Sequence, residues 1–172
     1  MRAAFITEPG PPEAIQVGEL PVPVPGPTVV LVAGEVAAVK AADTFSRSGR
    51  YPTPMPLPFV VGRDLVGTVT AVCPGSGFAP GERVWCNSLG HGGRQGSCAT
   101  YAVVPADRLY PLPDGAEPAA VVAAFHPAAT AFIGLHHRVC ARSGQAILGA
   151  DNDFCIFGPF DHKPGRSSLA GS

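Results

Sequence analysis

Paired cysteines are missing from this sequence. Its five cysteines are odd in number and widely spaced, and none forms a C-x-x-C pair (Cys73, Cys86, Cys98, Cys140 and Cys155). A disulfide framework uses an even set of cysteines, and a structural zinc lobe needs clustered thiolates. The spacing therefore argues against both kinds of stabilisation.

The sequence also lacks a strong net charge and a long apolar segment. Its 172 residues carry a formal net charge of -1, which gives no electrostatic footprint for nucleic acid or an anionic membrane. No run approaches the length of a membrane span, and Met1 and Arg2 lead directly into strand-like residues rather than a signal peptide. We therefore expect a cytoplasmic location and neither a nucleic-acid nor a membrane partner.

Glycine (21 residues) and proline (20 residues) are abundant, and this composition fits a small barrel with many turns better than a helical bundle. The longest β-like run, residues 28–39, is predicted to be a central strand. Further strands are predicted at residues 3–7, 15–19, 65–72, 84–86, 98–104, 108–112 and 145–148, and helices at 41–49, 117–124 and 128–141, the last two separated near Pro127.

Residues 58–83 (PFVVGRDLVGTVTAVCPGSGFAPGER) place several glycines around the strand predicted at 65–72. None of these glycines opens a long helical pattern, so strand turns and close backbone approaches explain them better than a phosphate-binding loop. The glycine-rich residues 90–96 (GHGGRQG) also lie between strands, and a hairpin loop is the favoured interpretation there.

Several motifs in this stretch resemble those of the medium-chain dehydrogenase/reductase superfamily. The run "G-x-[DE]-x-x-G…V-G…G-[DE]-R-V" is matched in order by GRDLVG at 62–67 and GERV at 81–84. The likeness extends from about Arg2 to Ala150 and is strongest to the zinc-free quinone oxidoreductases of the zeta-crystallin type. It implies a mostly β, partly open GroES-like barrel, followed by two helices and the first strand of an incomplete Rossmann domain.

The resemblance also suggests a division into domains. Residues 1–124 would form the GroES-like barrel, and residues 125–150 would begin the NADPH-binding Rossmann domain. Residues 151–172 would be a divergent tail, whose low-complexity end (DHKPGRSSLAGS) has a linker-like composition.

Zinc-dependent members of the superfamily hold a catalytic metal with a cysteine, a histidine and a second cysteine or carboxylate. The corresponding positions here are Lys40, Arg63 and His126. Two cations repel a divalent metal, and one imidazole cannot complete a site that needs three protein ligands. We therefore expect no catalytic zinc.

The zeta-crystallin-type pattern "N-x-x-[DE]-x-Y-x-R-x-G-x-Y" corresponds to KAADTFSRSGRY at 40–51. Lys40 and Phe45 replace the asparagine and tyrosine that lie by the nicotinamide in that family. They are candidate catalytic residues together with His126, which could act as an acid or base or simply as a loop or capping residue. Asp43 and Arg47, at i and i+4, are interpreted mainly as a local ion pair rather than as catalytic groups.

Cofactor-binding positions follow from the same resemblance. Thr130 matches the threonine of "x-T-A-[YF]" near the nicotinamide, and Gly149 and Ala150 begin the fingerprint "V-L-[VI]-x-G-A-x-G-G-V-G". Residues 151–155 (DNDFC) then stand where the later glycines belong. We expect NADPH binding by this chain to be weak or absent, and we suspect truncation or an out-of-frame end.

The resemblance implies an activity in which hydride passes from NADPH to a quinone or another conjugated carbonyl. This chain would supply the substrate side and would be inactive alone. Two alternatives remain open: a binding module that pairs with a full-length relative, and a non-catalytic remnant. We also expect exposed apolar surface, self-association through the C-terminal region or partial disorder from about Ala129, because six side chains cannot all face the barrel (Phe132, Ile133, Leu135, Val139, Ile147 and Leu148).

Overall fold

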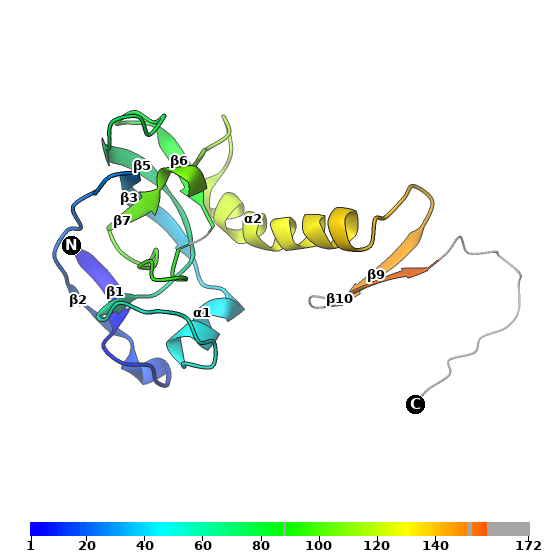
Figure 1. Ribbon diagram of the computed structural model, residues 1–172, viewed down its shortest axis with the longest axis horizontal. Helices are drawn as coiled ribbons and strands as arrows, with labels where there is room; N and C mark the ends of the chain where they lie inside the picture. The colour runs from blue at the N-terminus through cyan, green and yellow to red at the C-terminus, as the bar shows by residue number, and fades with distance from the viewer. Residues whose placement is uncertain (88, 151–152, 158–172) are drawn as a thin grey trace, which may run out of the picture. The chain divides into compact units, whose positions relative to one another are not determined.

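The computed structural model of the protein describes residues 1–87, 89–150 and 153–157 (Figure 1). The chain divides into two compact units, Met1–His126 and Pro127–Ser172. The first unit contains the β-rich body and the beginning of a long helix. The second contains the rest of that helix and a two-stranded sheet.

The first unit is built from two antiparallel sheets. The three-stranded sheet has the order β2-β1-β4, and the five-stranded sheet has the order β7-β3-β5-β6-β8. The bounds are β1 (Arg2–Ile6), β2 (Gln16–Glu19), β3 (Val29–Ala38), β4 (Phe59–Val60), β5 (Asp64–Val72), β6 (Arg83–Cys86), β7 (Tyr101–Pro105) and β8 (Tyr110–Pro111). This mostly β, partly open architecture confirms the predicted fold class, and β3 is an interior strand as expected.

The glycines around β5 have the structural role that the sequence indicated. A Cβ added at Gly67 would overlap the carbonyl oxygen of Ala33 on β3, so the two strands can approach only because no side chain intervenes. Gly62 has φ of +99°, a backbone conformation that L side chains rarely adopt. Gly62 therefore sets the path of the chain into β5, and Gly67 allows β5 to lie close to β3.

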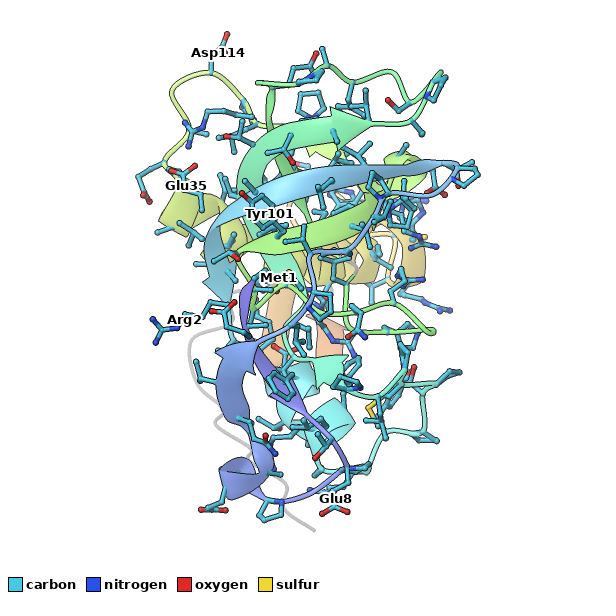
Figure 2. All side chains as sticks on the ribbon, turned by 90° about the vertical axis from the view of Figure 1, so that its left-hand side faces the viewer. Met1, Arg2, Glu8, Glu35, Tyr101 and Asp114 are labelled. Atoms are coloured by element: carbon cyan, nitrogen blue, oxygen red, sulfur yellow. The ribbon has the colours of Figure 1, made fainter. Side chains whose placement is uncertain are left out.

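Alternating residues of the five-stranded sheet fill the main core. Figure 2 shows Glu8 and Asp114 at opposite ends of the first unit, and the strands lie between these two ends. The buried residues of this core are Val30, Val32, Leu65, Val69, Val84, Cys86, Leu89, Ala102, Val104 and Leu109. Cys86 belongs to this core, and no disulfide joins the four described cysteines Cys73, Cys86, Cys98 and Cys140.

Helical elements connect and follow the strands. They are η1 (Pro12–Ala14), α1 (Ala41–Arg47), η2 (Ala106–Arg108) and α2 (Pro118–Phe132), and η3 (Ile133–Arg138) continues α2 as a π-helical segment. A second core joins α2 to the sheet: Val121 and Val122 are buried with Val66 of β5. The ring of Trp85 on β6 stacks on Phe125 with centroids 4.4 Å apart.

The prediction of two separate helices is wrong, because Pro127 lies inside α2. A proline removes an amide donor and normally ends a helix. Here the carbonyl oxygen of Ala123, four residues earlier, accepts a hydrogen bond from the side chain of Lys40 at 2.9 Å. The Lys40 side chain thus provides the hydrogen bond that the amide of residue 127 would otherwise donate.

The joined helix also corrects the expectation about apolar length. Pro118–Arg138 spans 21 residues with a mean hydropathy of 1.5, so its length and composition alone would suffice to cross a membrane. Only 17% of its 18-residue apolar window is buried. A single helix of this kind is weak evidence for a span, because core helices of globular proteins have similar sequences.

The second unit ends in a hairpin. The predicted strand at 145–148 is present as β9 (Ala146–Ala150), and β10 (Asp153–Phe157) pairs with it in antiparallel register, from Ala150 opposite Asp153 to Ala146 opposite Phe157. One edge of β9 is therefore paired, which the sequence did not predict. The remaining tail residues, 151–152 and 158–172, lie outside the described residues, as does the linker-like character assigned to them.

Candidate functional site

The site begins where β3 gives way to α1. The carboxylate of Asp43 accepts a hydrogen bond from the backbone amide of Lys40 at 2.7 Å, which satisfies a donor at the start of α1. Arg47 donates to the carbonyl of Gly10 instead of pairing with Asp43. The predicted Asp43–Arg47 ion pair is therefore wrong, because the Asp43 carboxylate is directed at the N-terminus of α1 and Arg47 binds the Gly10 carbonyl.

Arg63, in the turn before β5, forms an ion pair with Asp43. Its Nε lies 3.7 Å from Asp43 Oδ1, and its Nη2 donates to Ser46 Oγ at 3.3 Å. Burial raises the pKa of Asp43 above its ordinary value of 3.8, although the hydrogen bond from Lys40 and the charge of Arg63 act in the opposite direction. The carboxylate is therefore held in a partly desolvated environment.

Asp64, the first residue of β5, is the centre of the site. Its side chain is only 3% exposed, and its two oxygens contact different partners. Oδ1 lies 3.3 Å from His126 Nδ1, and Oδ2 lies 3.4 Å from Lys40 Nζ. Lys40 Nζ also donates to the carbonyls of Val122 and Ala123, both at 2.9 Å.

We call the five residues Lys40, Asp43, Arg63, Asp64 and His126 the Asp64 cluster. Two cations and two carboxylates balance within it, and the imidazole of His126 adds a ring nitrogen in contact with the Asp64 carboxylate. Arg63 Nε and Asp64 Oδ2 are buried without a hydrogen bond, so their ion pairs act through charge alone. A buried pair of this kind is costly to disrupt by removing one partner.

The residues present do not fit a catalytic zinc ion. The ammonium of Lys40 and the guanidinium of Arg63 already pair with carboxylates at two of the three positions that correspond to metal ligands. Within residues 1–87, 89–150 and 153–157, no group of three or more His, Cys, Asp or Glu side chains could hold a metal. Zinc independence itself stays a prediction.

The other predicted site residues lie elsewhere. Phe45 on α1 is 44% exposed, and the guanidinium carbon of Arg50 lies 5.4 Å from the centre of its ring. Thr130 is an exposed residue of α2 in the second unit. Gly149 and Ala150 belong to β9, opposite Phe154 and Asp153 of β10. Of the predicted catalytic residues, the structure brings together Lys40 and His126, but not Phe45.

The described part of the second unit does not fit the pyrophosphate of a dinucleotide. Such a site needs a glycine-rich turn from a strand into a helix, whose N-terminal amides bind the phosphates. Here β9 is followed by the antiparallel strand β10, and no helix follows β9 in the described residues.

Sequence reasoning did not assign a role to Asp64, although it lies in the recognised motif at 62–64. One local signal was present: a charged residue directly precedes the apolar strand LVGTVTAV. A carboxylate at the buried end of a strand requires a partner, and the partners here come from positions 40 and 126, which are distant in sequence.

Comparison with known proteins gives consistent matches. Residues 26–114 match the family described as the alcohol dehydrogenase GroES-like domain. Quinone oxidoreductases of Mus musculus and Lama guanicoe are 34% and 33% identical to the chain over 150 residues, covering 86% of this chain and 44% of each relative. The chain thus spans less than half the length of these relatives.

Solved structures show the same fold. A mycobacterial protein complexed with NADPH matches with a TM-score of 0.75 and 32% identity, over 84% of this chain and 42% of that one. A quinone oxidoreductase of Pseudomonas syringae matches with a TM-score of 0.71 and 25% identity, over 80% of this chain and 41% of that one. These matches cover most of the described residues.

Proposed function

Because the chain belongs to the alcohol dehydrogenase GroES-like domain family and is related to quinone oxidoreductases, we propose that it forms the substrate side of an NADPH-dependent quinone oxidoreductase-like enzyme. The observation that supports the proposal is that the family match covers most of the Asp64 cluster. The family match at 26–114 contains four residues of the Asp64 cluster, all except His126. The substrate would be a quinone or another conjugated carbonyl.

His126 is the proposed acid or base of this site. Reduction of a quinone or an enone adds a hydride and a proton, and a positioned side chain can supply that proton. The contact between His126 Nδ1 and the buried Asp64 Oδ1 directs an Nδ1–H at this carboxylate, so Nε2 is the ring nitrogen that would exchange a proton with the substrate. The orientation of the imidazole is then set by a carboxylate that β5 holds in place.

Three finer statements belong to the same proposal. The 172-residue chain alone binds NADPH weakly or not at all, which is supported by the β9–β10 hairpin at the expected phosphate site. The chemistry is zinc-independent, which is supported by Lys40 and Arg63 at the ligand positions. The chain is therefore inactive by itself, and its expected cytoplasmic location stays a prediction.

A chimera tests the activity. Residues 1–150 would be joined to the cofactor domain of the Mus musculus relative, and NADPH oxidation would be followed with tetramethyl-1,4-benzoquinone. All four ring carbons that a cysteine thiol could attack carry a methyl group in this quinone. We expect turnover that the 172-residue chain lacks. His126→Gln should lower the rate by about 100-fold, as expected for loss of a general acid, whereas His137→Gln, at an exposed position, should not. A chimera that binds NADPH yet reduces no quinone would contradict the proposal.

A second candidate is a binding module that pairs with a full-length relative. The exposed apolar side chains of Phe132 and Ile133 favour it, because 56% and 50% of these residues are accessible. Co-purification with a tagged full-length quinone oxidoreductase, lost in a Phe132→Ser/Ile133→Ser variant, would support this alternative. A chain that elutes alone at all concentrations would count against it.

A further inference from the structure

Lys40 meets α2 at the one turn where Pro127 disrupts its hydrogen bonding. In an α-helix the carbonyl of residue i accepts from the amide of residue i+4, so Ala123 would pair with residue 127. Pro127 has no amide hydrogen, and the Ala123 carbonyl therefore lacks its partner within the helix. Lys40 Nζ lies 2.9 Å from that oxygen.

The remaining contacts of the ammonium hold it at this point. Lys40 Nζ donates to the Val122 carbonyl at 2.9 Å, and Asp64 Oδ2 lies 3.4 Å away. Two of the three ammonium hydrogens are donated to the two carbonyls, and Asp64 Oδ2 attracts the ammonium through its charge. The Lys40 side chain is 17% exposed and the Asp64 side chain 3%, so the charge is largely shielded from water.

We propose that Lys40 is a positioning residue whose ammonium supplies the hydrogen-bond donor that Pro127 lacks, so that α2 continues through the proline with its adjacent turn fixed to Asp64. The same Asp64 contacts His126, the residue directly before Pro127. Lys40 therefore acts through the helix and through Asp64, and not on a substrate. This inference does not depend on the proposed reaction.

A double-mutant cycle isolates the coupling between Lys40 and Pro127. Lys40→Met keeps the length of the side chain but removes the donors, and Pro127→Ala restores the missing amide. Trp85 is the only tryptophan of the chain, and it stacks on Phe125 of α2, so its fluorescence reports unfolding at this contact. The four proteins would be unfolded in urea.

We expect K40M to lower the folding equilibrium constant by about tenfold or more in the parent chain, the range for hydrogen bonds to charged groups. In the P127A background the loss should be smaller by about fivefold. A residual loss is expected in both backgrounds because Asp64 loses its cation. Equal losses in the two backgrounds would overturn the proposal.

Pro118→Ala is the matched control. Pro118 is the first residue of α2, where a missing amide costs nothing because no carbonyl of the helix precedes it. The loss caused by K40M should therefore be the same in the parent chain and in P118A. A reduction as large as that in P127A would mean that any proline replacement in α2 relieves the loss, which contradicts the specific coupling to Pro127.

A spectroscopic measurement avoids the need for K40M to fold. The sequence contains only two lysines, Lys40 and Lys163, so ¹⁵N-lysine labelling gives two ammonium signals, which Lys163→Arg assigns. We expect the Lys40 signal to show hydrogens protected from solvent exchange, and exchange should be faster by about threefold or more in P127A, where Ala123 gains a competing donor. An unprotected Lys40 signal, or equal exchange in both proteins, would overturn the proposal.

Discussion

The two ends of the long helix have similarly apolar sequences but different surroundings. Near its start, Val121 and Val122 are 7% and 5% exposed and pack with Val66 of β5. At its end, Phe132 and the following Ile133 are 56% and 50% exposed. Apolar character therefore predicts burial only where the chain supplies a partner surface, and in the first unit Val66 and Leu112 belong to that surface. The start of the helix is also anchored by Lys40, which donates to its backbone carbonyls.

Of the changes considered, removing the Asp64 carboxylate should lower the free energy of unfolding most, because Asp64 holds the cation that anchors the start of α2. Asp64→Asn leaves the Lys40 ammonium in a largely buried position without its counter-ion, and we expect a loss of about 3 kcal/mol in the free energy of unfolding. Urea unfolding followed by Trp85 fluorescence measures it. The control is Glu35→Gln, which breaks a pair with Arg83 whose side chains are both 46% exposed, and its loss should be below about 1 kcal/mol. Similar losses in both variants would show that the cluster does not anchor α2.

Two substitutions that shorten apolar side chains compare the two ends of the long helix directly. Val122→Ala removes two buried methyl groups and should lower the free energy of unfolding by about 2 kcal/mol. Ile133→Ala removes more carbon at an exposed position and should change it by less than about 0.5 kcal/mol. Thermal unfolding of the two variants, monitored by circular dichroism, provides the measurement. A larger loss in Ile133→Ala would mean that Ile133 is buried in solution.

Local patterns were sufficient to predict most of the fold but not the contacts of the site. The strands at 28–39 and 65–72 were found because alternation and β-branched residues are local properties, and β3 and β5 correspond to them. Pro127 was taken as a helix end because the donor that compensates for it comes from Lys40, far away in sequence.

The charged residues show the same limitation. The i,i+4 spacing of Asp43 and Arg47 suggested an ion pair, but tertiary partners, Arg63 and the Gly10 carbonyl, prevailed. Such partners are set by packing between elements that are far apart in sequence, which no short pattern reveals. The resemblance placed Lys40, Arg63 and His126 at corresponding positions, and the structure adds Asp64 as the group between Lys40 and His126.

The exposed end of the helix should promote self-association. We expect the chain, whose monomer mass is 17.6 kDa, to show a concentration-dependent larger mass in light scattering, because Phe132 and Ile133 form adjacent exposed apolar groups. Phe132→Ser/Ile133→Ser should shift the population towards monomer. Val24→Ser, which alters an 88% exposed residue in the first unit, should not. A parent chain that is monomeric throughout the concentration range would disprove this prediction.

The smallest expected effect is the pH dependence that Asp43 of the Asp64 cluster gives to the free energy of unfolding. Burial raises the pKa of Asp43 above 3.8, so the folded state binds a proton more tightly than the unfolded state does. The stabilisation from that proton is fully present below the unfolded pKa and is lost as the pH rises through the folded pKa. Asp43→Asn stays neutral and keeps an oxygen that can accept from the Lys40 amide. We therefore expect the free energy of unfolding of the parent, relative to Asp43→Asn, to fall as the pH rises above about 4. Urea unfolding at a series of pH values measures this difference, and a difference that is constant or grows with pH would show that burial does not dominate at Asp43.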